Sequence, residues 1–127
     1  MTEQAQPTPP STQVQYVREA DCEALYANNV VAETSVWDLK VIFGILDQSV
    51  QPNRVMQHTS INLPWTQAKL LSYFLRIFLA VHELQNGKIS MPAAIVPPDP
   101  NTLTGPEITP EVREAVGKIY KDWLANL

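Results

Sequence analysis

Three stretches of the chain have patterns typical of β-strands: the second and third repeat at a period of two, and the first has β-forming residues at both ends. They cover residues 25–34, 37–46 and 55–63, and the links between them are short. Short links between consecutive strands favour an antiparallel meander. The paired amides Asn28 and Asn29 are poor strand formers, so they predict a bulge, an edge position or a buried amide network in the first stretch.

The apolar period changes to that of a helix after the third stretch. Pro64 suits the first turn of a helix, because its missing N–H has no intrahelical partner there. Gly87 suits the positive-φ position that follows a helix C-terminus. The apolar residues between them predict a helix from about Trp65 to Asn86.

This helix is apolar on more than one side. At about 100° per residue its apolar arc spans roughly 220°, against about 100° for a helix with one buried face. A three-stranded sheet can cover one stripe, so another layer must cover the second. We predict that this second stripe associates with another surface, and we call it the interface stripe: Leu71, Leu75, Leu79 and His82.

A second helix is predicted at the end of the chain, over residues 109–127. Thr109 suits the N-cap, Pro110 the first helical position, and Glu111 complements the macrodipole. Apolar residues recur at steps of three and four, so this helix is amphipathic and must dock on another surface. We predict that it docks through Val112, Val116, Ile119 and Trp123.

Proline marks the parts of the chain that do not belong to a core. Of the 11 prolines, three lie in the first ten residues and six lie between Pro92 and Pro110. We therefore expect a disordered arm over residues 1–20, a β-β-β-α core over 21–90, a proline-rich linker over 91–108 and the final helix. The predicted fold class is α+β, with a three-stranded antiparallel meander packed on one long helix.

Charge and cysteine content bear on partners and compartment. The net charge is −4 and the nine basic residues are scattered, whereas nucleic-acid binding needs clustered Lys and Arg, so such binding is disfavoured. Cys22 is the single cysteine and cannot close a disulfide within the chain. No secretory signal and no span long enough for a bilayer is visible in the sequence, so we expect a cytoplasmic protein without membrane contact.

Candidate catalytic and metal-binding residues are few. His82-Glu83 begins like a zinc-protease helix motif, but Asn86 stands where the second histidine belongs. His58 could pair with a serine or with Cys22, although nothing in the sequence fixes that geometry. Asp38 and Asp47 flank one strand and lie too far apart to share a substrate. We therefore predict no catalytic, metal or cofactor site.

Four aromatic residues could form a platform on which nucleic-acid bases stack. Without basic companions they are better interpreted as core residues. They are Tyr26, Trp37, Phe43 and Trp65.

The order of several short motifs resembles a small prokaryotic family catalogued as a domain of unknown function (number 3467). The motifs are Tyr26-Ala27-Asn28, Phe43-Gly44, the segment from Pro64 to Leu71, and Glu83 with Gly87. The resemblance covers about residues 25–90. It differs at residue 63, where the family carries serine and this chain leucine, and in the more apolar helix from Tyr73 to Val81. The resemblance implies the fold but no activity.

These observations lead to a functional hypothesis. We expect a non-enzymatic protein-interaction module that forms a homodimer and acts on an unidentified protein partner as an adaptor, assembly factor or chaperone-like factor. One alternative is a small enzyme or ligand-binding domain with a pocket between sheet and helix, lined by Met56, His58 and Tyr73. Another alternative is a dimeric regulator associated with nucleic acid.

Overall fold

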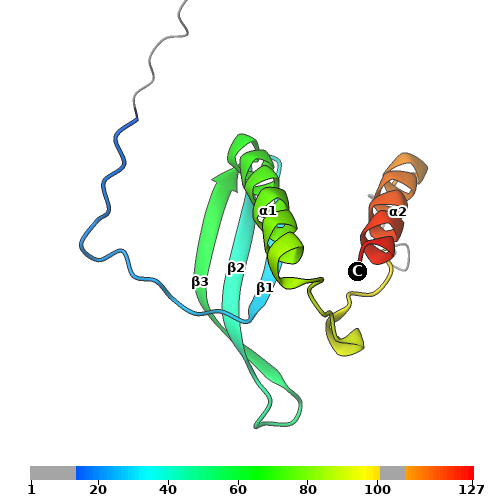
Figure 1. Cartoon of the computed structure of the whole chain (residues 1–127), viewed down its shortest axis with the longest axis horizontal. Helices are drawn as coiled ribbons and strands as arrows, with labels where there is room; N and C mark the ends of the chain where they lie inside the picture. Colours follow the sequence, from blue (N-terminus) through cyan, green and yellow to red (C-terminus); the bar gives the residue numbers. More distant parts are fainter. Residues whose placement is uncertain (1–13, 101–107) are drawn as a thin grey trace, which may run out of the picture. The chain divides into compact units, whose positions relative to one another are not determined.

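The computed structural model describes residues 14–100 and 108–127. The chain divides into two compact units, the first ending at Asn62 and the second beginning at Leu63. Figure 1 shows the elements, which confirm the α+β class. In chain order they are β1 (Asn29–Thr34), β2 (Asp38–Asp47), β3 (Arg54–Pro64), α1 (Trp65–Asn86), the 3₁₀ turn η1 (Ala93–Ile95) and α2 (Pro110–Ala125).

The three strands form one antiparallel sheet in the order β1-β2-β3, so the predicted meander is confirmed. β1 pairs with β2 in a register that places Asn29 opposite Gly44 and Thr34 opposite Leu39. A short turn joins these strands, in which the Ser35 hydroxyl oxygen accepts hydrogen bonds from the backbone N–H groups of Trp37 and Asp38, each at 3.1 Å. This hydroxyl satisfies two donors that the tight turn would otherwise leave free.

The first strand begins four residues later than predicted, at Asn29 instead of Leu25. The reason lies in Asn28, whose backbone N–H donates to the Gly44 carbonyl at 3.1 Å. Its side-chain Oδ1 accepts from the Leu46 N–H at 2.8 Å, in place of a backbone carbonyl. The side chain therefore ends the regular ladder. Of the three alternatives, the edge position is confirmed for Asn29, because β1 is an edge strand, and the buried amide network is wrong, because Asn28 is exposed.

Pro64 does not open the helix, as the sequence suggested, but ends β3. Its ψ of 151° is extended, and the helix starts at the next residue, Trp65. The predicted helix bounds, Trp65–Asn86, are confirmed. At the other end, Gly87 has the positive φ that was expected, 86°, and its N–H donates to the Glu83 carbonyl at 2.9 Å.

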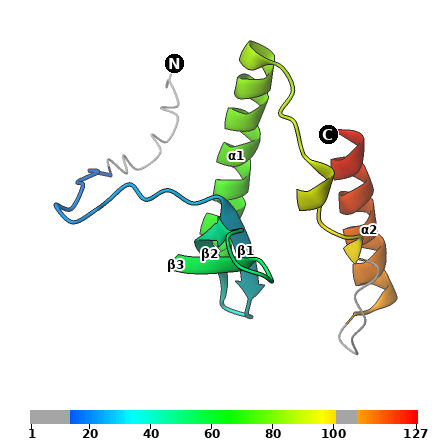
Figure 2. The ribbon, with the colours of Figure 1, turned by 90° about the horizontal axis from the view of Figure 1, so that it is seen from below.

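The predicted proline-rich linker contains a short helical turn, η1. Figure 2 shows this turn between α1 and α2 along the chain. The N-cap of α2 is confirmed, since the Thr109 side chain accepts a hydrogen bond from the Val112 N–H at 3.3 Å. Most of the predicted arm (residues 1–13) and residues 101–107 of the predicted linker lie outside the described residues.

The core of the described chain is very small. Ile42, on the central strand, is the one buried hydrophobic side chain among the described residues, with 9% of its surface exposed. The prediction that four aromatic residues belong to the core is wrong for three of them, because Tyr26, Trp37 and Trp65 are exposed. Trp37 is 83% exposed because it lies in the turn before β2, where no neighbouring strand covers it.

Candidate interaction surface

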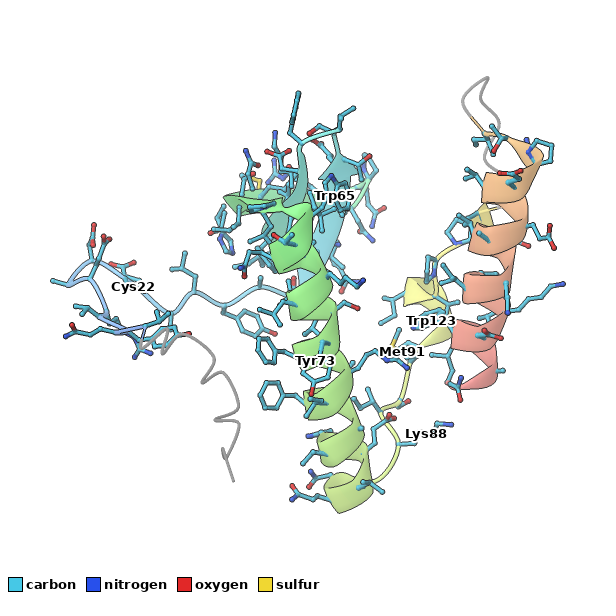
Figure 3. All side chains as sticks on the ribbon, turned by 90° about the horizontal axis from the view of Figure 1, so that it is seen from above. Cys22, Trp65, Tyr73, Lys88, Met91 and Trp123 are labelled. Carbon is cyan, nitrogen blue, oxygen red and sulfur yellow. The ribbon has the colours of Figure 1, made fainter. Side chains whose placement is uncertain are left out.

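The surface of α1 is the main candidate site of the molecule. None of its 22 residues is buried. Eleven of them are large apolar or aromatic side chains that keep more than a third of their surface exposed. Figure 3 shows side chains projecting from this helix, with Tyr73 labelled. These eleven residues are Trp65, Leu70, Leu71, Tyr73, Phe74, Leu75, Ile77, Phe78, Leu79, Val81 and Leu84.

All four residues of the interface stripe are exposed. Leu75 and Leu79 retain 51% and 49% of their surfaces, and Leu71 is exposed as well. Residues three and four apart are neighbours on a helix, so the stripe forms one continuous strip along α1. Phe78, beside it, is 67% exposed. A helix that is apolar on several sides is normally buried on several sides, so this exposure marks α1 as a surface for further packing.

His82 is held by the residue one turn later. The Asn86 side-chain amide lies 3.4 Å from His82 Nδ1 and donates to the His82 carbonyl at 3.2 Å. The contact involves Nδ1 and not the other ring nitrogen, Nε2, and the His82 side chain as a whole is exposed. Histidine and asparagine therefore form a polar end to the interface stripe, whose other members are leucines.

A polar ridge runs beside the interface stripe, formed by Lys69, Arg76 and Glu83 at intervals of seven residues. The Glu83 carboxylate accepts a hydrogen bond from the Ile89 N–H at 2.9 Å, which ties the chain after the helix to the last turn. The ion pairs of the described residues are Lys40–Glu33 and Arg54–Asp47, and neither lies on α1.

The second candidate surface is α2. Val112 and Ile119, from the predicted docking set, are exposed, Ile119 at 69%. Trp123 is exposed at the edge of the same face, and Val116 is half-buried. The structure thus places these four side chains on one side of the helix, where Ile119 is mostly uncovered and the other three are partly covered.

Tyr120 attaches α2 to the linker, a contact that the sequence analysis missed. Its hydroxyl donates to the Pro97 carbonyl at 3.0 Å. Gly117, three residues earlier and therefore on the same side, is buried. Proline has no backbone N–H, so a proline-rich segment has more carbonyl acceptors than N–H donors, and a hydroxyl donor such as that of a tyrosine could have been expected to bind it. The sequence does not show which tyrosine binds, because Tyr120 and Pro97 are 23 positions apart.

His58 has a structural role in the sheet unit. Its Nε2 lies 2.9 Å from the Tyr26 carbonyl oxygen and its Nδ1 lies 2.7 Å from Thr59 Oγ1. Tyr26 precedes β1 whereas His58 is on β3, so the segment before β1 crosses the sheet, as Figure 1 shows. Since both ring nitrogens have partners, neither faces Cys22, which is exposed in the segment before the sheet (Figure 3). The suggested His58–Cys22 pair is therefore not formed in this structure.

The two aspartates at the ends of β2 form hydrogen bonds with residues of the adjacent turns. Asp38 accepts from the Ser35 hydroxyl at 2.8 Å, in the first turn. Asp47 accepts from the Ser49 hydroxyl and from the Ser49 N–H, and Arg54 contacts its other oxygen at 3.4 Å. The Ser49 hydroxyl first, then the Ser49 N–H and Arg54, hold the pKa of Asp47 below its ordinary value of 3.8. These carboxylates stabilise turns and do not converge.

No cluster of three or more His, Cys, Asp or Glu side chains able to hold a metal occurs among the residues that the structure describes. Within the same residues, no helix has the length and apolar character needed to cross a membrane. Comparison with family models, curated proteins and solved structures gave no match.

Proposed function

We propose that this chain is a non-enzymatic interaction module that forms a homodimer through α1 and acts as an adaptor or assembly factor through its C-terminal helix. The observation that carries this proposal is the exposure of large apolar side chains on α1, with Leu75 and Leu79 about half exposed. Fully burying such a side chain is worth about 1.5–3 kcal/mol, so leaving many in water is costly.

The exposed apolar side chains on all sides of α1 sum to an area similar to that of one protein interface. If each of the eleven side chains has roughly 150–200 Å² and half of it is exposed, the total is on the order of 900 Å². A specific interface of standard size buries about 800 Å² on each partner. Because the eleven side chains lie on several sides of the helix, a single interface buries only part of this area, and we assign the side that carries the interface stripe to a second copy of the chain.

The small core supports the same proposal. A chain with one buried hydrophobic side chain among its described residues gains little stability from its own packing. Oligomerisation is a common way in which small domains add buried apolar area. Self-association would therefore stabilise the fold as well as create the interface.

The adaptor role is assigned to α2, because its amphipathic face is separate from α1 in the sequence and carries its own exposed side chains. Val112, Ile119 and Trp123 offer an apolar strip of about three helical turns. Helices of this kind bind grooves through anchors at steps of three, four and seven residues. Tyr120 would hold the helix to the linker while that strip stays available.

The dimer is tested by size-exclusion chromatography with light scattering on the full chain at two concentrations. We expect a mass of twice 14.2 kDa at the higher concentration. Replacing both Leu75 and Leu79 with serine should give a monomer that remains helical by circular dichroism. The matched control replaces Val112 and Ile119 with serine and should remain a dimer. A wild-type chain that is monomeric at both concentrations would overturn the proposal.

The adaptor role is tested separately, by capturing partners from native cells with the full chain. Ile119→Ser with Trp123→Ala should lose partners that the wild type retains, while the dimer persists. The control is Lys121→Ala, on the polar side of α2. An unchanged set of partners in the Ile119→Ser, Trp123→Ala variant would exclude α2 as the adaptor surface.

A further inference from the structure

The exposed side of α1 contains a regular heptad seam. Six residues recur at alternating steps of four and three, the spacing at which two helices pack side by side as a coiled coil. Two of the three leucines of the interface stripe, Leu75 and Leu79, lie at its middle, and smaller or polar residues lie towards both ends. We define the α1 seam as Ala68, Ser72, Leu75, Leu79, His82 and Asn86.

We infer that two copies of α1 pair in an antiparallel arrangement along this seam, with the two-fold axis at the level of residue 77 along the helix. This inference rests on the proposed homodimer and specifies its geometry. Centring the pair at residue 77 places Leu75 against Leu79 of the partner subunit, in two symmetric central layers. The same register places Ser72 against His82 of the partner subunit, and Ala68 against Asn86 of the partner subunit.

The polar layers distinguish this arrangement from a parallel one. In a parallel pair each seam residue meets its own copy, so two His82 rings would face each other, as would two Asn86 amides. In the antiparallel pair a small residue accompanies each large polar one. The Asn86 side-chain amide nitrogen can only donate, so His82 Nδ1 is the acceptor in their 3.4 Å contact. The neutral ring then carries its proton on Nε2, which can donate to the hydroxyl of Ser72 of the partner subunit.

The charges on α1 are also placed for an antiparallel neighbour. The first turn contains no acidic residue and the last turn no basic one, although these would complement the helix's own macrodipole. Instead Lys69 lies near the N-terminus and Glu83 in the last turn. In the inferred register Lys69 lies beside Glu83 of the partner subunit, on the flank of the seam, and the two macrodipoles oppose each other.

The flanks of the seam add one favourable and one unfavourable contact at the axis. Phe78, 67% exposed, lies one residue from the centre and packs against Phe78 of the partner subunit. On the other flank Arg76 approaches Arg76 of the partner subunit, and like charges oppose the pairing there. Arg76→Gln should therefore tighten the dimer several-fold.

Disulfide trapping on the full chain tests the register. Cys22, an exposed free thiol, is first replaced with serine. Ser72→Cys and His82→Cys are then made in separate chains. In the inferred dimer, position 72 lies opposite position 82 of the other subunit. Two copies of either position lie ten residues apart along the axis, about 15 Å, too far for a disulfide, which needs Cα atoms within about 7 Å.

Mixing the two single-cysteine chains under mild oxidation should give a covalent dimer, and each chain alone should not. Covalent dimers from either chain alone would overturn the antiparallel register and support a parallel one. A dimer by light scattering that gives no covalent product in the mixture would overturn the α1 seam while leaving the proposed function intact. A monomer by light scattering would overturn both.

A charge exchange provides the second test. Lys69→Glu and Glu83→Lys should each weaken the dimer, and the double variant should restore most of the lost affinity, because each subunit then presents the reversed pair. Two losses that simply add in the double variant would contradict the proposed Lys69–Glu83 contact.

Discussion

Gly44 permits the close approach of the central strand to its neighbour. A Cβ atom added at Gly44 would lie 2.7 Å from the Met56 carbonyl oxygen and 2.8 Å from Val55 Cγ1. The first of these is a backbone atom of β3, which cannot move without disturbing the ladder. Two side-chain hydrogen bonds act beside this packing. The Asn28 side chain ends the β1 ladder, and His58 contacts the Tyr26 carbonyl in the segment before β1.

Gly44→Ala should therefore destabilise the fold by about 1–3 kcal/mol, the range for inserting a methyl group into a packed position. Urea unfolding at a fixed protein concentration measures the change. Ser60→Ala, on the exposed part of β3, serves as the control and should change the free energy of unfolding by less than about 0.5 kcal/mol. Equal stability of Gly44→Ala and wild type would show that β3 yields at this point.

Asp47 predicts a pH dependence. The pKa of Asp47 in the folded state lies below its ordinary value of 3.8. The ionised carboxylate therefore stabilises the turn at pH values above 3.8, and this stabilisation is lost as the pH falls through the folded-state pKa. Asp47→Asn, or Ser49→Ala, should flatten the fall in thermal stability below about pH 4. Melting curves measured from neutral to acidic pH test this, and a wild-type slope in both variants would be the contrary result.

At the scale of elements, the two helices differ in how they are fixed. α1 begins without a side-chain cap and ends at Gly87, so it depends on packing of its apolar surface. α2 has a full N-terminal signature, with the Thr109 cap, Pro110 and Glu111. Its stability is therefore more local than that of α1.

Thr109→Ala should loosen α2 by about 1 kcal/mol, because the Val112 N–H loses its acceptor. Amide hydrogen exchange of the α2 backbone should become about fivefold faster, whereas Thr109→Ser should exchange like the wild type. Unchanged exchange in Thr109→Ala would mean that tertiary contacts, and not the cap, hold the helix.

Phe78→Ala tests which side of α1 associates. Aromatic side chains at the centre of an interface commonly dominate its energy, so we expect at least a tenfold weaker dimer. Tyr73→Ala is the matched control, since Tyr73 is also an exposed aromatic residue on α1 but lies away from the α1 seam. Equal weakening by the two substitutions would show that the interface is not confined to the seam side.

At the scale of the whole molecule, the described chain has one buried hydrophobic side chain and many exposed ones. A chain of this kind is expected to gain stability from its partner, so folding and association should be linked.

The melting temperature should accordingly rise with protein concentration, by on the order of 2–3 °C for each tenfold increase in a dimer of this size. The Leu75→Ser, Leu79→Ser variant provides the control and should melt at a lower, concentration-independent temperature. A wild-type melting temperature that does not change with concentration would contradict the linkage.

Several features of the fold were accessible from the sequence because they depend on residues that are close together in the chain. The bounds of α1 followed from the apolar period and Gly87, and the cap of α2 from Thr109. The error at Pro64 arose because proline is acceptable both at the end of a strand and at the first helical position, and only its ψ of 151° separates the two. The surplus apolar surface of α1 was likewise visible as periodicity.

By itself, then, the sequence determined the existence and order of the three strands and two long helices, and the excess of apolar surface, since local propensity and side-chain period act over one or two turns of chain. Only the tertiary structure decided that the Asn28 side chain replaces a ladder acceptor, that Gly44 lies against β3, and that Tyr120 binds the linker. These contacts join residues 11 to 23 positions apart. Which distant group satisfies a hydrogen bond or fills a space is fixed by how the strands and helices pair, and no local pattern encodes that pairing.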